Sequence, residues 1–160
     1  MSNQRVGKVI VTSFAPRSIR SDLLICGTPP GFFTHPQSAS SSEQILRQLE
    51  HLICIEKISQ PGVPTDLIIV DNYYNYPPGQ EYLQALLDDP TLSVKIISRE
   101  NIGRSFGGYA EAIRLYANSY DYFLLTEDDI VVGGDNYIQS LIDEYHDLGD
   151  YGFLPIQGVS

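Results

Sequence analysis

The sequence contains no tryptophan, one methionine and two cysteines in 160 residues. Cys26 and Cys54 are too few for the disulfide framework of a small secreted domain, and neither belongs to a Cys-x-x-Cys pair. Basic residues are also scarce, since 10 lysines and arginines stand against 20 acidic residues and the net charge is -10. Proteins that bind nucleic acid or anionic membranes through phosphate groups are normally basic, so this charge argues against both classes.

Long apolar runs are absent as well. The longest, such as LIIV at residues 67–70, fall far short of the roughly 20 residues of a membrane-spanning helix. The N-terminus lacks the apolar stretch and cleavage site of a signal peptide. We therefore expect a cytoplasmic protein without a transmembrane segment. The length suits one domain over residues 1–160, and 42% hydrophobic residues are typical of a globular chain.

Apolar runs alternate with helical patterns along the chain. The runs predict four buried strands, over residues 6–13, 66–70, 92–98 and 120–126. Apolar residues at helical spacing predict four helices, over residues 43–59, 77–87, 104–119 and 136–145. A fifth strand is predicted at residues 152–156. Such alternation is typical of βαβ units, so we predict an α/β fold with a mostly parallel open sheet and helices on both faces.

Two predicted helices carry apolar residues that we expect to face the sheet. In the helix over residues 77–87 these are Tyr82, Leu83, Leu86 and Leu87. In the helix over residues 104–119 they are Ala110, Ile113, Tyr116 and Ala117. The long connection over residues 14–42 is rich in proline and serine, and connections of such length are usually functional or mobile.

Polar residues follow every predicted strand at its carboxyl end. These are Thr12-Ser13, Asp71-Asn72, the turn from Asn101 to Arg104, and the cluster from Glu127 to Asp129. Parallel strands end at one edge of a sheet, and open parallel sheets bind their ligands beyond that edge. We therefore expect these groups to line one site, and their convergence carries more weight than any single motif.

The acidic cluster is the sharpest of these features. Three adjacent carboxylates repel one another and disfavour folding unless something neutralises them. Glu127 and Asp129 lie two apart and share a face if the strand continues through them. Two carboxylates with water and phosphate oxygens are a common way to hold Mg²⁺, and Mn²⁺ accepts the same ligands. A solvated acidic turn is the alternative.

The remaining polar groups have two interpretations each. Asp71 suits a hydrogen bond from a base N–H or a ribose hydroxyl, or else an Asx turn. The helix that begins at Arg104 offers N–H groups and a cation to an anion, with Gly107 and Gly108 permitting close approach. The alternative there is an ordinary turn between a strand and a helix, without a bound anion. The three histidines form no catalytic arrangement with serine or cysteine.

Taken in order, four segments resemble the donor-binding half of GT-A-fold, family 2-type glycosyltransferases. They are VIVTSF at 9–14, LIIVDN at 67–72, ENIG at 100–103 and YFLLTEDD at 122–129. The resemblance implies a Rossmann-like nucleotide-binding half that recognises a nucleotide-sugar donor with a divalent cation, Mn²⁺ or Mg²⁺. The cluster from Glu127 to Asp129 is similar to the acidic "DxD" motif of that family.

The resemblance also implies roles for the matched residues. Asp129 corresponds to the metal ligand, and Glu127 and Asp128 correspond to groups that contact ribose or metal-bound water. Asp71 corresponds to the aspartate that contacts the base. Thr12 lies near the base in such enzymes, and Asn101 with Gly103 shapes the donor pocket. Arg104 has no counterpart in the family pattern, and its expected phosphate contact follows from its place at a helix start.

Several features depart from that family. Glu127 stands where aspartate is commoner, residues 104–109 do not reproduce the usual pattern, and the first loop is longer. The catalytic base and the acceptor-binding half of such enzymes correspond to sequence beyond Ser160. We therefore expect a donor-binding part whose acceptor is an unidentified saccharide, lipid or protein. A nucleotidyltransferase-like protein and a non-catalytic nucleotide-binding or interaction domain remain alternatives.

Overall fold

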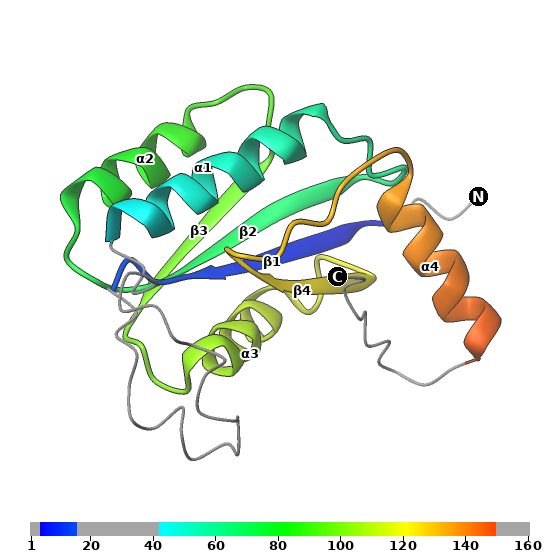
Figure 1. Cartoon of the computed structure of the whole chain (residues 1–160). Coiled ribbons are helices and arrows are strands. Elements are labelled where there is room, and N and C mark those ends of the chain that lie inside the picture. The colour runs from blue at the N-terminus through cyan, green and yellow to red at the C-terminus, as the bar shows by residue number, and fades with distance from the viewer. Residues whose placement is uncertain (1–3, 16–41, 150–160) are drawn as a thin grey trace, which may run out of the picture.

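The computed structural model describes residues 4–15 and 42–149 (Figure 1). In these residues strands and helices alternate as β1 (Val6–Thr12), α1 (Ser42–Ile58), β2 (Thr65–Asn72), α2 (Pro77–Leu87), β3 (Val94–Arg99), α3 (Arg104–Tyr116), β4 (Tyr122–Glu127) and α4 (Tyr137–Leu148). Cys26, His35 and the predicted strand at 152–156 lie outside the described residues. Among the helices described, none is long and apolar enough to cross a membrane.

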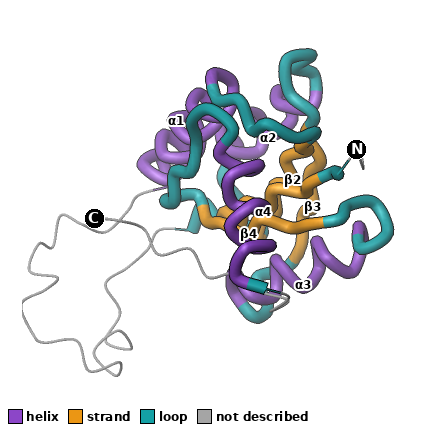
Figure 2. The backbone as a smooth tube through the Cα atoms, turned by 90° about the vertical axis from the view of Figure 1, so that its right-hand side faces the viewer, coloured by secondary structure: helices purple, strands orange, loops and turns teal. Residues whose placement is uncertain are grey.

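The described strands form one parallel sheet in the order β3-β2-β1-β4. Helices α1 and α2 cover one face and α3 covers the other, as Figures 1 and 2 show from two directions. This confirms the predicted α/β fold with a Rossmann-like arrangement. Strand order reverses at β1, because the chain runs outward through β2 and β3 and then returns to place β4 on the other side. In open parallel sheets, ligands bind at this kind of reversal.

Side chains alternate between the two faces along each strand. On the face that we call the α1 face, Ile10 and Ile69 pack against Leu49 of α1 and Leu83 of α2. On the opposite face, the α3 face, Val9, Val11, Ile68 and Val70 pack against Ala112 of α3. Helix α4 packs on the α1 face of β1 and β4 through Ile138 and Ile142, which cluster with Val6 and Leu124.

The side of α3 that faces the sheet differs from the prediction. Gly108 and Ala112 are its buried residues, whereas Ala110 and Ala117 are exposed and Ile113 is 38% exposed. Of the predicted set, Tyr116 alone packs against the sheet core. A Cβ atom at Gly108 would lie 2.8 Å from Val11 Cγ2, so α3 approaches the sheet on its small side chains.

The inward side of α2 was also predicted with one error. Leu83 and Leu86 are buried and Tyr82 packs against the core, but Leu87 is 46% exposed at the end of the helix. Leu87 is the last residue of the helix.

Candidate functional site

Three polar side chains lie in a row across the carboxyl ends of the strands. Thr12 on β1 and Asp71 on β2 are register partners, so both lie on the α1 face, and each is only 1% exposed. Thr12 Oγ1 donates a hydrogen bond of 2.7 Å to Asp128 Oδ2, just after β4. The backbone N–H of Asp128 donates to Val11 O at 3.2 Å. The fold therefore brings together three of the residues that the sequence singled out.

Asp71 is the member of this row with a buried oxygen, Oδ1, that lacks a hydrogen-bond partner among the described residues. Burial raises the pKa of the Asp71 carboxyl to about 6. A buried acceptor without a donor costs free energy, commonly about 1–3 kcal/mol. In a native protein such a group requires an explanation, and a ligand that donates a hydrogen bond supplies one.

Strand β2 carries a second buried aspartate at its other end, which provides an internal comparison. Asp66 Oδ2 accepts hydrogen bonds from Lys95 Nζ at 2.8 Å and from Tyr120 Oη at 2.7 Å. Burial by itself would raise the pKa of Asp66, but these donors outweigh it and hold the pKa at about 2. The structure thus satisfies the aspartate at the amino end, whereas Asp71 Oδ1 at the carboxyl end lacks a donor among the described residues.

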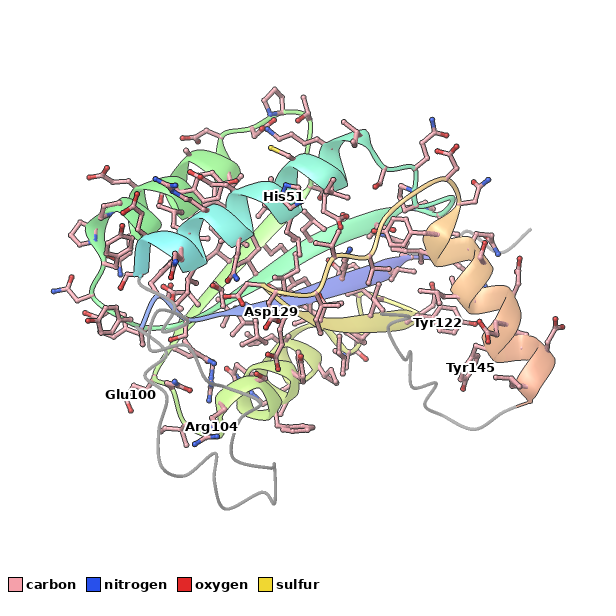
Figure 3. The ribbon with its side chains drawn as sticks, in the orientation of Figure 1. His51, Glu100, Arg104, Tyr122, Asp129 and Tyr145 are labelled. Carbon is pink, nitrogen blue, oxygen red and sulfur yellow. The ribbon has the colours of Figure 1, made fainter. Side chains whose placement is uncertain are left out.

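The acidic cluster forms a turn instead of continuing the strand. Strand β4 ends at Glu127, and the N–H of Ile130 donates to Glu127 O at 3.1 Å. The strand does not continue through Asp129, so the condition under which Glu127 and Asp129 would share one face is not met. Glu127 lies in register with Val11 on the α3 face, Asp128 is buried against Thr12, and Asp129 is exposed at the end of β4 (Figure 3).

This turn bears directly on the expected metal. Among the described residues, no three side chains of histidine, cysteine, aspartate or glutamate gather to hold a metal ion. A magnesium-type site needs fewer protein ligands, because one or two carboxylates suffice when diphosphate oxygens and waters complete the shell. Glu127 and Asp129 fit such a site in ligand type, whereas the buried Asp128 is engaged by Thr12.

Tyr109 of α3 lies beside the acidic turn and was missed by sequence reasoning. Burial raises the pKa of Tyr109 to about 12, and the charges of Glu127, Asp129 and Asp128 add to the effect. The hydroxyl therefore keeps its proton at neutral pH and remains a hydrogen-bond donor. The chain has 11 tyrosines, and only the packing of α3 distinguishes this one.

The turn between β3 and α3 is held on the other face of the sheet. Arg99 donates from Nη1 to Asn72 Oδ1 at 2.7 Å and from Nη2 to Ile102 O at 2.7 Å. Asn72 Nδ2 in turn donates to Arg104 O at 3.2 Å. Arg99, which sequence reasoning left without a role, thus fastens the start of α3 to the end of β2 through Asn72.

The predicted residues of this turn lie at the start of α3. Asn101, Gly103 and Arg104 are exposed there, and the φ of 79° at Gly103 favours glycine. Figure 3 shows Arg104 at the start of α3, with Glu100 close before it. They share the carboxyl edge with Thr12 and Asp71 but lie toward the α3 face.

Packing accounts for the glycine pair that follows. A Cβ atom at Gly107 would lie 2.0 Å from Ile102 O, and one at Gly108 would meet Val11. Both positions therefore require glycine for the approach of α3 to the turn and the sheet. Phosphate binding is not needed to explain them.

Comparison with known proteins returned no match among family models, curated proteins or solved structures.

Proposed function

We propose that this chain binds a nucleoside diphosphate sugar with a divalent cation and acts as the donor-binding part of a glycosyltransferase. The buried, unpartnered Oδ1 of Asp71, at the carboxyl edge next to the reversal of strand order, is the observation that carries the proposal. The ordered likeness of the four strand-end segments to family 2-type enzymes supports the same conclusion.

Each residue at this edge has a separate task in the proposal. Asp71 accepts a hydrogen bond from an N–H of the base, which relieves the cost of its buried oxygen. Thr12 holds Asp128 in place through the hydrogen bond between them. Asp129 and Glu127 offer carboxylate oxygens to Mn²⁺ or Mg²⁺. The cation, when bound, neutralises the diphosphate so that it leaves more readily from the sugar.

The charge of the chain is consistent with a bridging cation. A net charge of -10 and three adjacent carboxylates repel a diphosphate unless a cation lies between them. Arg104 at the start of α3 adds one positive charge near the same edge. The proposal therefore requires that nucleotide binding depend on the cation, which a simple basic phosphate site does not.

Calorimetry with a panel of nucleoside diphosphates tests the proposal. The uridine, guanosine, thymidine and adenosine diphosphates are titrated with Mn²⁺ and again with a chelator, after circular dichroism has shown that the chain is folded. We expect one nucleotide to bind in the presence of Mn²⁺ and to lose its affinity with the chelator. A folded chain that binds none of them contradicts the proposal and leaves a solvated acidic turn. Tighter binding of the matching triphosphate, titrated in the same way, would instead favour a nucleotidyltransferase-like protein.

A further inference from the structure

A second polar cluster is buried between the α1 face of the sheet and helices α1 and α4, away from the carboxyl ends of the strands. Lys8 lies in the middle of β1 on the α1 face and is 0% exposed. Its Nζ forms an ion pair with Glu56 of α1 and donates to Tyr137 Oη of α4 at 3.3 Å. Tyr137 Oη donates to Glu56 Oε2 at 2.9 Å, which closes a triangle of side chains.

The third contact of Lys8 reaches the segment that follows the acidic turn. Lys8 Nζ donates to the carbonyl oxygen of Val132 at 2.9 Å. The desolvation of a buried ammonium group costs several kcal/mol unless paired groups offset it, so such a cluster is expensive to keep. A leucine or methionine at position 8 would fill the same space at a lower cost. An apolar side chain at position 8 could not donate a hydrogen bond to the Val132 carbonyl, and this contact provides a reason for the lysine.

Residues 128–136 connect β4 to α4 without regular structure and are held at both ends and at Val132, whose side chain also packs against the cluster of Val6 and Tyr137. At the start, Asp128 is bound to Thr12 and to the backbone of β1. At the end, Gly134 N donates to Ser59 Oγ at 3.0 Å and Gly134 O accepts from Gln60 N at 3.1 Å. Between these ends, Lys8 holds the carbonyl of Val132.

The stretch between the anchors is exposed and includes the expected metal ligand. Ile130 is 46% exposed and Val131 is 51% exposed, and Asp129 precedes them. These side chains do not hold the backbone by burial. The backbone of Asp129 is therefore restrained by Asp128 on one side and by Val132 on the other.

We propose that Lys8 is a positioning residue for the acidic turn: through the Val132 carbonyl it fixes the backbone after Asp129, and through Glu56 it ties that backbone to α1. The ligand-binding consequence rests on the proposed function, whereas the ordering of the segment does not. Groups that orient metal ligands at one remove typically change metal affinity by about 10- to 100-fold when they are lost.

The test uses the full chain with Lys8→Met, and with Lys8→Met combined with Glu56→Gln so that no unpaired carboxylate stays buried. Lys95→Met is the matched control, because Lys95 belongs to the Asp66 and Tyr120 cluster at the amino end of the sheet. Hydrogen exchange of the amides in 128–136 is measured first, without any ligand. We expect the double variant to lose protection in this segment but to keep it in β1 and β2, whereas Lys95→Met keeps it in both.

Ligand affinity is the second measurement. For the nucleotide that wild type binds, the double variant should require about 10- to 100-fold more Mn²⁺ for half-saturation. Binding of the matching nucleoside without diphosphate or metal should stay unchanged, because the contact to Asp71 is separate. A merely structural role lowers both affinities together or neither.

The outcomes of the two measurements are distinguishable. Unchanged protection of 128–136 in the double variant overturns the positioning role, whatever the chain binds. Lost protection with an unchanged Mn²⁺ requirement overturns its link to the metal. If wild type binds no nucleotide, the proposed function fails, and the exchange measurement alone decides whether Lys8 orders the segment.

Discussion

Thr12 donates a hydrogen bond of 2.7 Å to Asp128 across the boundary between β1 and β4, where the order of the strands reverses. Both side chains are 1% exposed. The bond joins two segments that are far apart in the sequence and fixes the carboxylate in the middle of the acidic turn. It thereby distinguishes Asp128, which is buried and bound to β1, from Glu127 and Asp129, to which our proposal assigns the metal.

The first prediction concerns this bond. Thr12→Val removes the hydroxyl but keeps the shape, and it leaves Asp128 buried without its donor from β1. We expect the free energy of unfolding to fall by about 1–3 kcal/mol, which urea titration measures. Thr12→Ser keeps the hydroxyl and is the control. Any loss in Thr12→Ser measures the missing methyl group. A Thr12→Val chain as stable as wild type would contradict the prediction.

The second prediction concerns the pH dependence of Asp71. The pKa of Asp71 is raised from 3.8 to about 6, so the folded chain binds a proton that the unfolded chain lacks between these values. The contribution of Asp71 to stability therefore rises as the pH falls from about 7 to about 4. Near pH 8 the ionised carboxylate destabilises the fold by up to about 3 kcal/mol, at 1.36 kcal/mol per unit of pKa shift.

The test of this prediction is Asp71→Asn. The variant should be more stable than wild type near pH 8, and the difference should shrink toward pH 4, in urea titrations at each pH. The same variant should bind nucleotide more weakly while its Mn²⁺ requirement stays the same. Asp66→Asn is a control of opposite sign, because the lowered pKa of Asp66, about 2, stabilises the fold above pH 4. A difference for Asp71→Asn that does not vary with pH contradicts the prediction.

The third prediction concerns the cation. Asp129→Asn keeps the size of the exposed side chain but removes the charge that we assign to the metal. We expect metal-dependent nucleotide binding to be lost, with little change in the free energy of unfolding, because surface substitutions usually shift it by less than about 0.5 kcal/mol. Glu81→Gln, at an exposed position of α2, changes the net charge equally and should bind as wild type does. Unchanged affinity in Asp129→Asn would sink the metal bridge.

The fourth prediction concerns the approach of α3 to the sheet. Inside a helix, alanine is favoured over glycine by about 1 kcal/mol, so Gly108→Ala would stabilise a helix that packs loosely. Here the new Cβ would lie 2.8 Å from Val11 Cγ2, and we expect a loss of about 1–3 kcal/mol instead. Ala110→Gly, at an exposed position of the same helix, measures propensity alone in the same urea titration. A stabilised Gly108→Ala chain would show that α3 can shift at little cost.

The fold was predictable because its signals are local. Apolar runs bounded by Pro, Gly and polar residues marked the strands, and helical spacing marked the helices between them. The alternation then implied a parallel sheet with polar strand ends at one edge. The errors concerned which side chains of a helix face the sheet, and not where the helices and strands lie in the sequence. Ala110 and Ile113 are apolar and at helical spacing, yet Gly108 and Ala112 form the buried side because small side chains allow a closer helix.

The sequence by itself determined which chemistry meets at the carboxyl edge, since Thr12, Asp71 and the acidic cluster each follow an apolar run. Only the tertiary structure decided which of these side chains are buried and which have hydrogen-bond partners. The β4 turn buries Asp128 against Thr12. Asp71 Oδ1 has no donor within the part of the chain that the structure describes, whereas Asp66 has several. Lys8, Glu56 and Tyr137 meet between the sheet and helices α1 and α4 although no local pattern relates them. Periodicity depends on neighbours in the chain, whereas hydrogen-bond partners depend on strand order and register, which local sequence patterns do not encode.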